Sequence, residues 1–344
     1  MQNQYYTPPQ LNNPTPVNQA YQQHLYFKNK RRKERNELIA TGLIIGGTIV
    51  ASLVIQVIIV TILQRTDYYS LYETSSLFQN AFNIIAVDVF SLVIPYFFMS
   101  LILKKRYTGD LIPREKIGKL PAFAWICIGM GCCVGANYVT AVVIEIFKQF
   151  GYELTQTELL EPSSPIECAA IVFSTALAPA LCEEFAMRCC ALGALKKYGK
   201  GFAVVAVSIV FGLIHGNVIQ FVFAFILGLI FGYITIKTDS VIPAMFIHGF
   251  NNGISVLSDV LKYSAGEKAS EYVGPVCYIT WLCLAAWGIV YLVFFKKEFK
   301  KQPRKLREPY ALSFGAKLLC LLPGFFVPIL ILIAITAQTV VPIK

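Results

Sequence analysis

The sequence is poor in charged residues and in histidine, and it lacks the motifs that mark several hydrolases and metal sites. Only 15% of its 344 residues are charged, against 56% hydrophobic, and three are histidines. Soluble domains carry roughly 25% charged residues, so this composition indicates a polytopic membrane protein. No Gly-x-Ser-x-Gly, Gly-x-Gly-Asp or His-Glu-x-x-His sequence occurs, and none of the ten cysteines forms a Cys-x-x-Cys pair. The missing protease motifs argue against serine and aspartyl protease centres of those types and against the zinc-binding helix of a metalloprotease. The cysteine spacing argues against a disulfide framework and against a cysteine zinc site.

The net charge of +10 comes from bases that lie in short clusters between apolar runs. Residues 28–35 hold six bases and 104–106 hold three. A nucleic-acid-binding protein would instead gather its bases along one stripe or face. The clusters follow the positive-inside pattern of membrane proteins, and we expect no nucleic-acid partner.

Nine apolar runs are long enough, or nearly long enough, to cross a bilayer. They lie at about 38–63, 82–103, 121–147, 169–196, 202–215, 218–236, 241–257, 272–295 and 312–340. The run at 202–215 is the shortest. The sequence therefore predicts an all-α, polytopic transmembrane helix bundle of about nine spans, with the active site inside the membrane core.

The distribution of bases predicts which side each loop occupies. With nine spans, 24 of the 30 bases lie on the side of the N-terminus and five on the other, while Arg188 lies within a span. By the positive-inside rule we expect an integral multi-pass protein of the cell membrane, with a cytoplasmic N-terminus and an external C-terminus. We therefore expect membrane lipid to surround the protein and to be one of its partners.

The chain divides into four parts by composition. Residues 1–27 contain no Asp, Glu, Lys or Arg, so we predict that 1–36 forms a disordered polar tail ending in a basic run. N-terminal transmembrane helices follow at 37–160, then a helix core at 161–260 that carries the polar residues of interest, and C-terminal transmembrane helices at 261–344. Gly-x-x-x-Gly pairs such as Gly42/Gly46 and Gly228/Gly232 are suited to close helix contacts.

The fourth run contains two carboxylates and a guanidinium, in the order Glu183-Glu184-x-x-x-Arg188. Ionisable groups within a span are costly unless paired or facing a watery cavity, so they suggest a functional site. Glu184 and Arg188 are i and i+4 and can pair on one helix face. Glu183 is turned away by about 100° and has no such partner. We expect Glu184 and Arg188 to be structural and Glu183 to be free for chemistry.

Two of the three histidines lie in later runs of the same core. His215 ends the fifth run after Phe211, and His248 lies in the seventh, one helical turn before Asn252. Either histidine alone is most simply read as a hydrogen-bonding group between helices. The two histidines, Asn252 and the Glu-Glu-x-x-x-Arg motif lie on three nearby helices. Taken together, they favour a joint site.

These residues resemble the CPBP (CAAX-protease-and-bacteriocin-processing, or Abi) family of intramembrane proteases. The family's three motifs are Glu-Glu-x-x-x-Arg, Phe-x-x-x-His and His-x-x-x-Asn. They stand here in order as Glu183-Glu184-x-x-x-Arg188, Phe211-x-x-x-His215 and His248-x-x-x-Asn252. The resemblance covers about 160–260 and identifies that part as the catalytic helix core.

The resemblance implies a hydrolase that cleaves a peptide bond of a membrane-associated or lipidated protein. Glu183 with His215 would activate water, and His248 with Asn252 would form an oxyanion hole. Implied substrates are prenylated proteins, bacteriocin leaders and pheromone precursors. Members are often called metalloproteases, and Glu183, His215 and His248 would be the ligands if zinc were bound. Asn252 is a poor zinc ligand but a good hydrogen-bond donor. We therefore favour a metal-free glutamate protease and assign no cofactor.

Two other classes of protein place polar groups within the membrane. A multi-span transporter would do so, but the sequence shows no inverted repeat and no paired broken helices. A haem protein could use two intramembrane histidines, but it would leave the Glu-Glu-x-x-x-Arg line without a role.

Overall fold

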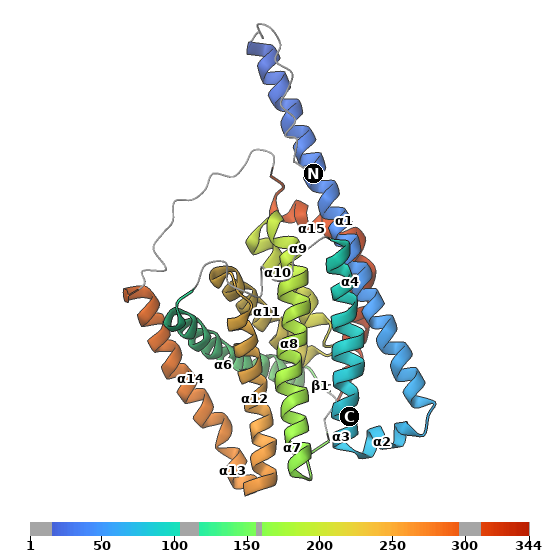
Figure 1. Cartoon of the computed structure of the whole chain (residues 1–344), viewed down its shortest axis with the longest axis vertical. Helices are drawn as coiled ribbons and strands as arrows, with labels where there is room; N and C mark the ends of the chain where they lie inside the picture. The colour runs from blue at the N-terminus through green and yellow to red at the C-terminus, as the bar shows by residue number, and fades with distance from the viewer. Residues whose placement is uncertain (1–15, 104–116, 156–159, 296–310, 344) are drawn as a thin grey trace.

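The computed structural model describes residues 16–103, 117–155, 160–295 and 311–343 as a helical bundle with one small ribbon of two strands (Figure 1). The first half contains α1 (Pro16–Gln64), α2 (Tyr68–Thr74), α3 (Ser76–Phe82), η1 (Asn83–Val93), α4 (Ile94–Ile102), α6 (Lys119–Gln149) and β1 (Tyr152–Leu154). One helical segment then runs through α7 (Pro165–Ile171), η2 (Val172–Leu177), α8 (Ala178–Glu184), η3 (Phe185–Leu192), α9 (Gly193–Leu195) and η4 (Lys196–Tyr198). The remaining elements are α10 (Lys200–Leu213), α11 (Val218–Thr238), α12 (Ile242–Ala265), α13 (Glu267–Glu271), α14 (Val273–Val290), η5 (Tyr291–Phe295), α15 (Phe314–Ala337) and β2 (Val340–Pro342). The predicted all-α, polytopic class is confirmed.

Seven helices in the described part of the chain are long and apolar enough to cross a membrane. The two other predicted spans correspond to α10 and α12. Helix α10 has only 14 residues, and α12, although 24 residues long, is not among the seven. Both nevertheless lie within the bundle. The motif His215 follows the end of α10 by two residues, and His248 lies within α12. The total of nine spans remains a prediction.

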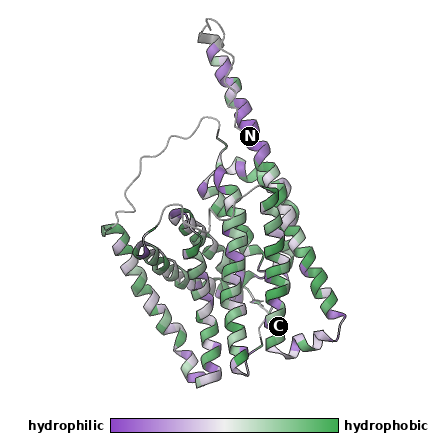
Figure 2. Cartoon of the chain, in the orientation of Figure 1, coloured by the Kyte–Doolittle hydropathy of each residue, from purple (hydrophilic) through white to green (hydrophobic). Residues whose placement is uncertain are grey.

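The N-terminal part differs from the predicted disordered tail. Residues 1–15 lie outside the described part, but from Pro16 the chain is already helical and continues without a break to Gln64. Figures 1 and 2 show this hydrophilic half of α1 extending beyond the bundle. The physical reason is that a helix already nucleated by its membrane-embedded half can extend without a new nucleation cost.

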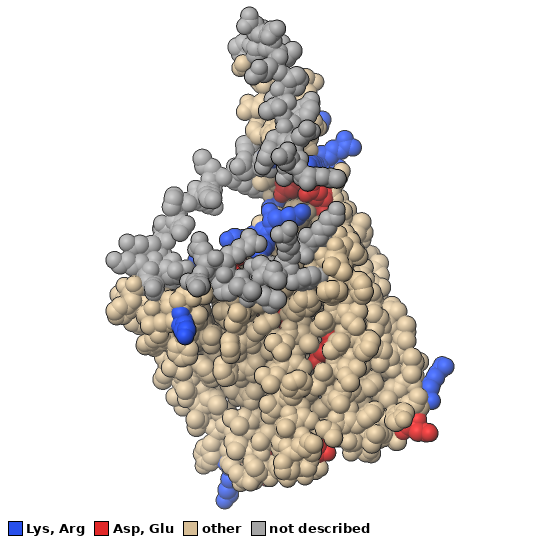
Figure 3. Space-filling view, viewed as in Figure 1, with Lys and Arg blue, Asp and Glu red and all other residues tan. Residues whose placement is uncertain are grey.

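Ion pairs group the charged segments by the end of the bundle at which they lie. At one end Lys197 lies 3.7 Å from Glu37, and Lys317 lies 4.0 Å from Glu34. Figure 3 shows acidic and basic side chains gathered at this end, below the extension of α1. At the other end, Lys262 pairs with Glu161 at 2.7 Å. This grouping agrees with the sides assigned from the sequence, and the choice of the cytoplasmic side remains a prediction.

The short strands join two loops that were both predicted on the external side. Strand β1 follows α6 and pairs antiparallel with β2, which follows α15, so that Glu153 lies opposite Val341. A ribbon of this kind requires both loops to lie at the same end of the bundle.

Glycine allows α1 and α15 to cross in direct backbone contact. A Cβ added at Gly46 would overlap the carbonyl group of Gly324, and one at Gly42 would lie 3.0 Å from Leu321. Gly228 of α11 similarly faces Ser208 of α10, where an added Cβ would lie 2.9 Å from the serine Cβ. Small residues at such crossings let helices gain van der Waals contact where the surrounding lipid supplies no hydrophobic drive.

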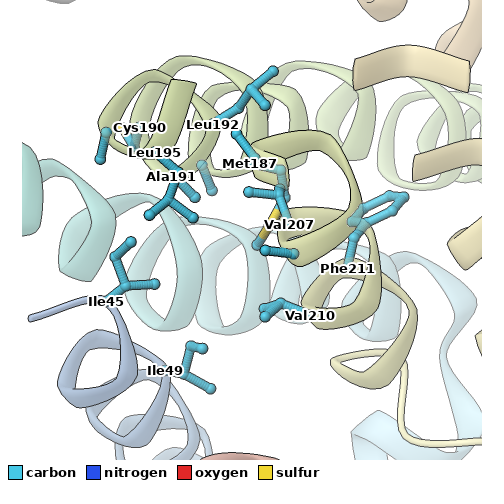
Figure 4. Close-up of a cluster of buried hydrophobic side chains, with 14 of the residues drawn as sticks. Ile45, Ile49, Met187, Cys190, Ala191, Leu192, Leu195, Val207, Val210 and Phe211 are labelled. Carbon is cyan, nitrogen blue, oxygen red and sulfur yellow. The ribbon is translucent and has the colours of Figure 1, made fainter. Parts of the chain in front are cut away.

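The core that supports the site lies where α1, the η3–α9 segment and α10 meet. Figure 4 shows Ile45 and Ile49 of α1 facing Met187 and the η3 side chains, with Val210 and Phe211 of α10 beside them. Met187 and Ile45 are almost fully buried. Burial of this kind fixes the backbone of η3, and with it the direction of the carboxylates one turn earlier.

Candidate active site

Two stretches of π-helix flank the Glu-Glu pair. Elements η2 and η3 have the wider π-helical turn, and the single α-helical piece between them, α8, ends with Glu183 and Glu184. π-helical turns are energetically unfavourable and occur often at functional sites, because each re-aims the side chains that follow. The motif of the fourth span therefore lies at a local distortion of an otherwise continuous helix.

Glu184 and Arg188 form a fully buried ion pair, as expected from their spacing. The Nε atom of Arg188 lies 3.1 Å from Glu184 Oε2, and the two side chains are 1% and 0% exposed. The other oxygen of Glu184 has a partner that the sequence did not predict, because His248 Nδ1 lies 3.0 Å from Glu184 Oε1. A carboxylate can only accept, so Nδ1 carries the proton and donates it. Glu184 thus holds His248 as well as Arg188.

Aromatic rings cover the rest of the Arg188 guanidinium. Its Cζ atom lies 4.3 Å from the ring centre of Phe211 and 5.2 Å from that of Phe231. These contacts compensate the buried cation through the negative faces of the rings. Phe211 and Phe231 therefore both cover the buried guanidinium, and a structural role for Phe211 stays a prediction. The contact of Phe231 was missed because a phenylalanine in an apolar helix gives no distinguishing signal.

Glu183 lies between the two histidines. Its Oε2 atom is 4.0 Å from His215 Nε2 and 3.9 Å from His248 Nε2, and the carboxylate is 17% exposed. This oxygen is buried and has no hydrogen-bond partner among the described residues. The structure thus brings together three residues predicted from separate helices, with Glu183 as the free carboxylate.

His215 is oriented by the end of its own helix. Helix α10 ends at Leu213, and the turn that follows passes through Gly216 at φ +70°. His215 Nδ1 lies 2.7 Å from the carbonyl oxygen of Phe211, which can only accept, so Nδ1 carries the proton. The neutral ring then presents the lone pair of Nε2 towards Glu183. The Phe-x-x-x-His spacing places that carbonyl one turn below the histidine.

Asn252 is near the cluster but is partly engaged elsewhere. Its Nδ2 atom donates to the carbonyl oxygen of Thr175 at 3.0 Å, and its Oδ1 accepts from Asn251 at 3.2 Å. One N–H of the amide remains for a ligand. Asn252 still lines the same cavity as His248, so the structure places it at the site with half of its donor capacity in use.

A cavity of about 360 Å³ opens onto the cluster. Its wall combines the four proposed catalytic residues with amide and hydroxyl groups from α3, η2, α11 and α12. The polar residues around it are Asn80, Asn83, Ser174, Thr175, Glu183, His215, Gln220, His248, Asn252 and Ser255. Such a polar pocket in an apolar bundle can accept a peptide backbone in extended form.

The donors do not fit a zinc ion. Donor atoms on one tetrahedral zinc lie about 3.3 Å apart, given bonds of about 2.0–2.1 Å. The Nε2 atoms of His215 and His248 lie farther than this from Glu183 Oε2, at 4.0 and 3.9 Å. Within the described ranges, no group of three or more His, Cys, Asp or Glu side chains could hold a metal ion. The ligand set named for zinc is therefore not assembled in the described residues. The mechanism proposed below uses no metal.

One acidic residue near the site was missed. Asp88 of η1 is 8% exposed and lines a second cavity together with Glu183 and His215. The signal was present, because Asp88 is the only Asp, Glu, Lys or Arg in the predicted span 82–103. The rule that intramembrane ionisable residues are functional candidates would have identified it.

The fold is that of an integral membrane protein, and its partly buried Glu–His cluster lies beside a polar cavity. Residues 165–254 match the family model described as type II CAAX prenyl endopeptidase Rce1-like. This match confirms the resemblance to the CPBP family, and it supports an intramembrane endopeptidase at the level of the family. No curated protein and no solved structure gives a significant match.

Proposed function

We propose that this protein hydrolyses a peptide bond of a membrane-associated or lipidated protein by means of a water molecule activated by Glu183. The observation that carries the proposal is the convergence of Glu183 Oε2, His215 Nε2 and His248 Nε2 at one end of a polar cavity. Polar contacts near 4 Å leave no direct hydrogen bond but suit one bridging water. A water held by a carboxylate and an imidazole can attack a carbonyl as its proton passes to the carboxylate.

The hydrogen-bond partners assign different roles to the two histidines. Both rings have Nδ1 protonated, because Phe211 O and Glu184 Oε1 can only accept. Neutral His215 therefore accepts from the water at Nε2 and orients it. Nδ1 of His248 is engaged by Glu184, so His248 can donate to an oxyanion only when its Nε2 carries a proton as well.

The reaction then needs only groups of this chain. The water oxygen bonds to the substrate carbonyl carbon, its proton goes to Glu183, and the carbonyl oxygen becomes negative. Nε2–H of His248 and the remaining N–H of Asn252 stabilise that oxygen. When the C–N bond breaks, Glu183 passes its proton to the leaving nitrogen, which restores the carboxylate.

The substrate class and the site of action belong to the same proposal. The family description supports prenylated CAAX proteins as one class, and the motifs are equally compatible with leader peptides and pheromone precursors. All are bound to the membrane before cleavage, which suits a site below the bilayer surface. We place the protein in the cell membrane with a cytoplasmic N-terminus, because the six bases of 28–35 lie at that end of α1.

The test compares wild-type membranes with Glu183→Gln membranes. The probe is a quenched fluorescent peptide that carries an S-farnesyl cysteine followed by three residues, and peptides released from the host membranes are compared by mass spectrometry in parallel. The matched control is Glu145→Gln, which alters an exposed glutamate of α6 remote from the cavity. We expect cleavage in wild type and Glu145→Gln and a loss of about 10²–10³-fold or more in Glu183→Gln. Equal cleavage by Glu183→Gln would refute the mechanism, and a precursor that accumulates only in that variant would identify a substrate.

A further inference from the structure

A second polar cavity meets the active site from the side of α1 and η1. Its volume is about 260 Å³, and it shares Glu183 and His215 with the cavity described above. The rest of its wall comes from α1, η1, α4 and the turn after α10, none of which carries His248 or Asn252. The residues concerned are Ile49, Ser52, Leu53, Gln56, Val87, Asp88, Ser91, Leu92, Tyr96 and Ile214. Glu183 is thus reached from two directions.

The polar groups of this second cavity, the α1–η1 cavity, have few partners within the protein. Asp88 is 8% exposed and makes no hydrogen bond or ion pair in the described part of the chain. The Ser52 hydroxyl is buried and has no hydrogen-bond partner among the residues that the structure describes. Ser91 donates to the carbonyl oxygen of Ala86 at 2.7 Å and keeps its lone pairs free. A buried carboxylate without a partner is very costly in a membrane protein unless water solvates it or it takes up a proton.

The lining suits water better than an apolar ligand. Ordered water in a protein needs a polar site, room for at least one molecule and two to four polar partners. Ser52, Gln56, Asp88, Ser91 and Glu183 together supply donors and acceptors around one volume. An acyl or prenyl chain placed there would desolvate Asp88 and gain no compensating contact for it.

We propose that the α1–η1 cavity holds the water consumed in hydrolysis and delivers it to Glu183, with Asp88 as the positioning residue that keeps this cavity hydrated. This inference rests on the proposed function. A bound peptide occupies the cavity that contains the oxyanion donors, so each turnover needs a water supply that does not pass through the substrate. One water is used for each bond cleaved, its OH going to the acyl carbon and its remaining proton to the leaving nitrogen by way of Glu183.

Hydration is tested first, without any substrate. Ser52→Cys and Ser100→Cys are compared in native membranes with 2-aminoethyl methanethiosulfonate, and labelling is read at each cysteine by peptide mass spectrometry, so native cysteines do not interfere. Both serine hydroxyls are buried without partners, but Ser100 of α4 does not line the α1–η1 cavity. Because only a thiolate in contact with water reacts, we expect Cys at position 52 to label about tenfold faster or more. Asp88→Leu should reduce that labelling to the rate of the control.

Kinetics with the farnesylated peptide then test delivery. Asp88→Leu keeps the branched, four-atom shape of the aspartate side chain but has no polar atom, so we expect kcat to fall about tenfold or more while KM changes less than about twofold. Asp88→Asn keeps a hydrogen-bonding group for water and should restore most of kcat. If Asp88 only supported folding, its replacement would not lower kcat selectively, with KM nearly unchanged, in the protein that remains folded.

The outcomes separate this inference from the function on which it rests. Equal labelling at positions 52 and 100, or no effect of Asp88→Leu on labelling, would overturn the hydrated cavity. A rise in KM with unchanged kcat in Asp88→Leu would show that the cavity binds substrate instead, which also overturns the inference. Failure of wild type to cleave any peptide in a Glu183-dependent way would refute the proposed function, and with it water delivery, even if the labelling contrast were observed.

Discussion

The buried Glu184–Arg188 pair allows stability and catalysis to be separated by mutation. Glu184→Gln leaves the guanidinium of Arg188, which is 2% exposed, without its ion-pair partner. Removing one member of a buried pair typically costs about 3–5 kcal/mol, because the other charge stays desolvated. The rings of Phe211 and Phe231 contact the guanidinium with or without Glu184, so they do not change this difference. We therefore expect a loss of about 3–5 kcal/mol in the free energy of unfolding.

The double variant Glu184→Leu/Arg188→Met provides the decisive comparison. It removes both charges and fills the space with apolar side chains, a change that is often neutral or stabilising. We expect it to be more stable than Glu184→Gln alone. It should nevertheless remain inactive, because His248 Nδ1 loses the acceptor that lies 3.0 Å away and the ring is no longer held towards Glu183.

The assay measures thermal unfolding in detergent together with cleavage of the farnesylated peptide per folded molecule. Glu183→Gln is the reference variant. Among the described residues, Glu183 Oε2 has no hydrogen-bond partner that the substitution would remove. We therefore expect this variant to be inactive but to melt near the wild-type temperature. A Glu184→Gln protein that melts within experimental error of wild type would contradict the buried-charge reasoning. A stable double variant with full activity would show that Glu184 does not hold His248 for catalysis.

Three other predictions follow from the site and the fold. His215→Ala and His248→Ala should each lower turnover by about 10²–10³-fold with the protein still folded, measured as cleavage per folded molecule, and an unchanged rate in either would remove that ring from the mechanism. Gly46→Leu should destabilise the contact of α1 with α15 by about 1–3 kcal/mol, seen as a lower melting temperature and yield, because an added Cβ would overlap the carbonyl of Gly324. Reporter fusions or cysteine labelling at Ala20 and Ile343 should give opposite sides of the membrane, and labelling of both from one side would refute the nine-span arrangement.

The residues of the motifs could be identified from the sequence because each motif lies within one helix. An i to i+4 spacing fixes which side chains share a face, so the pairing of Glu184 with Arg188 followed from local geometry alone. The freedom of Glu183 followed for the same reason, since the residues one turn away from it are apolar. Long apolar runs likewise specify membrane helices without reference to any partner.

What lies between helices could be decided only by the tertiary structure. His248 was expected to serve the oxyanion alone, yet packing of α12 against α8 also brings its Nδ1 to Glu184. Asp88 is separated from Glu183 by 95 positions in the chain, and only the packing of η1 beside α8 makes both line one cavity. The extension of α1 past the bundle depends on cooperative helix growth from its apolar half. The sequence alone determined which helices form and which of their faces are polar. The relative position of those faces depends on side-chain packing between distant segments. Only the tertiary structure could decide it, for this reason.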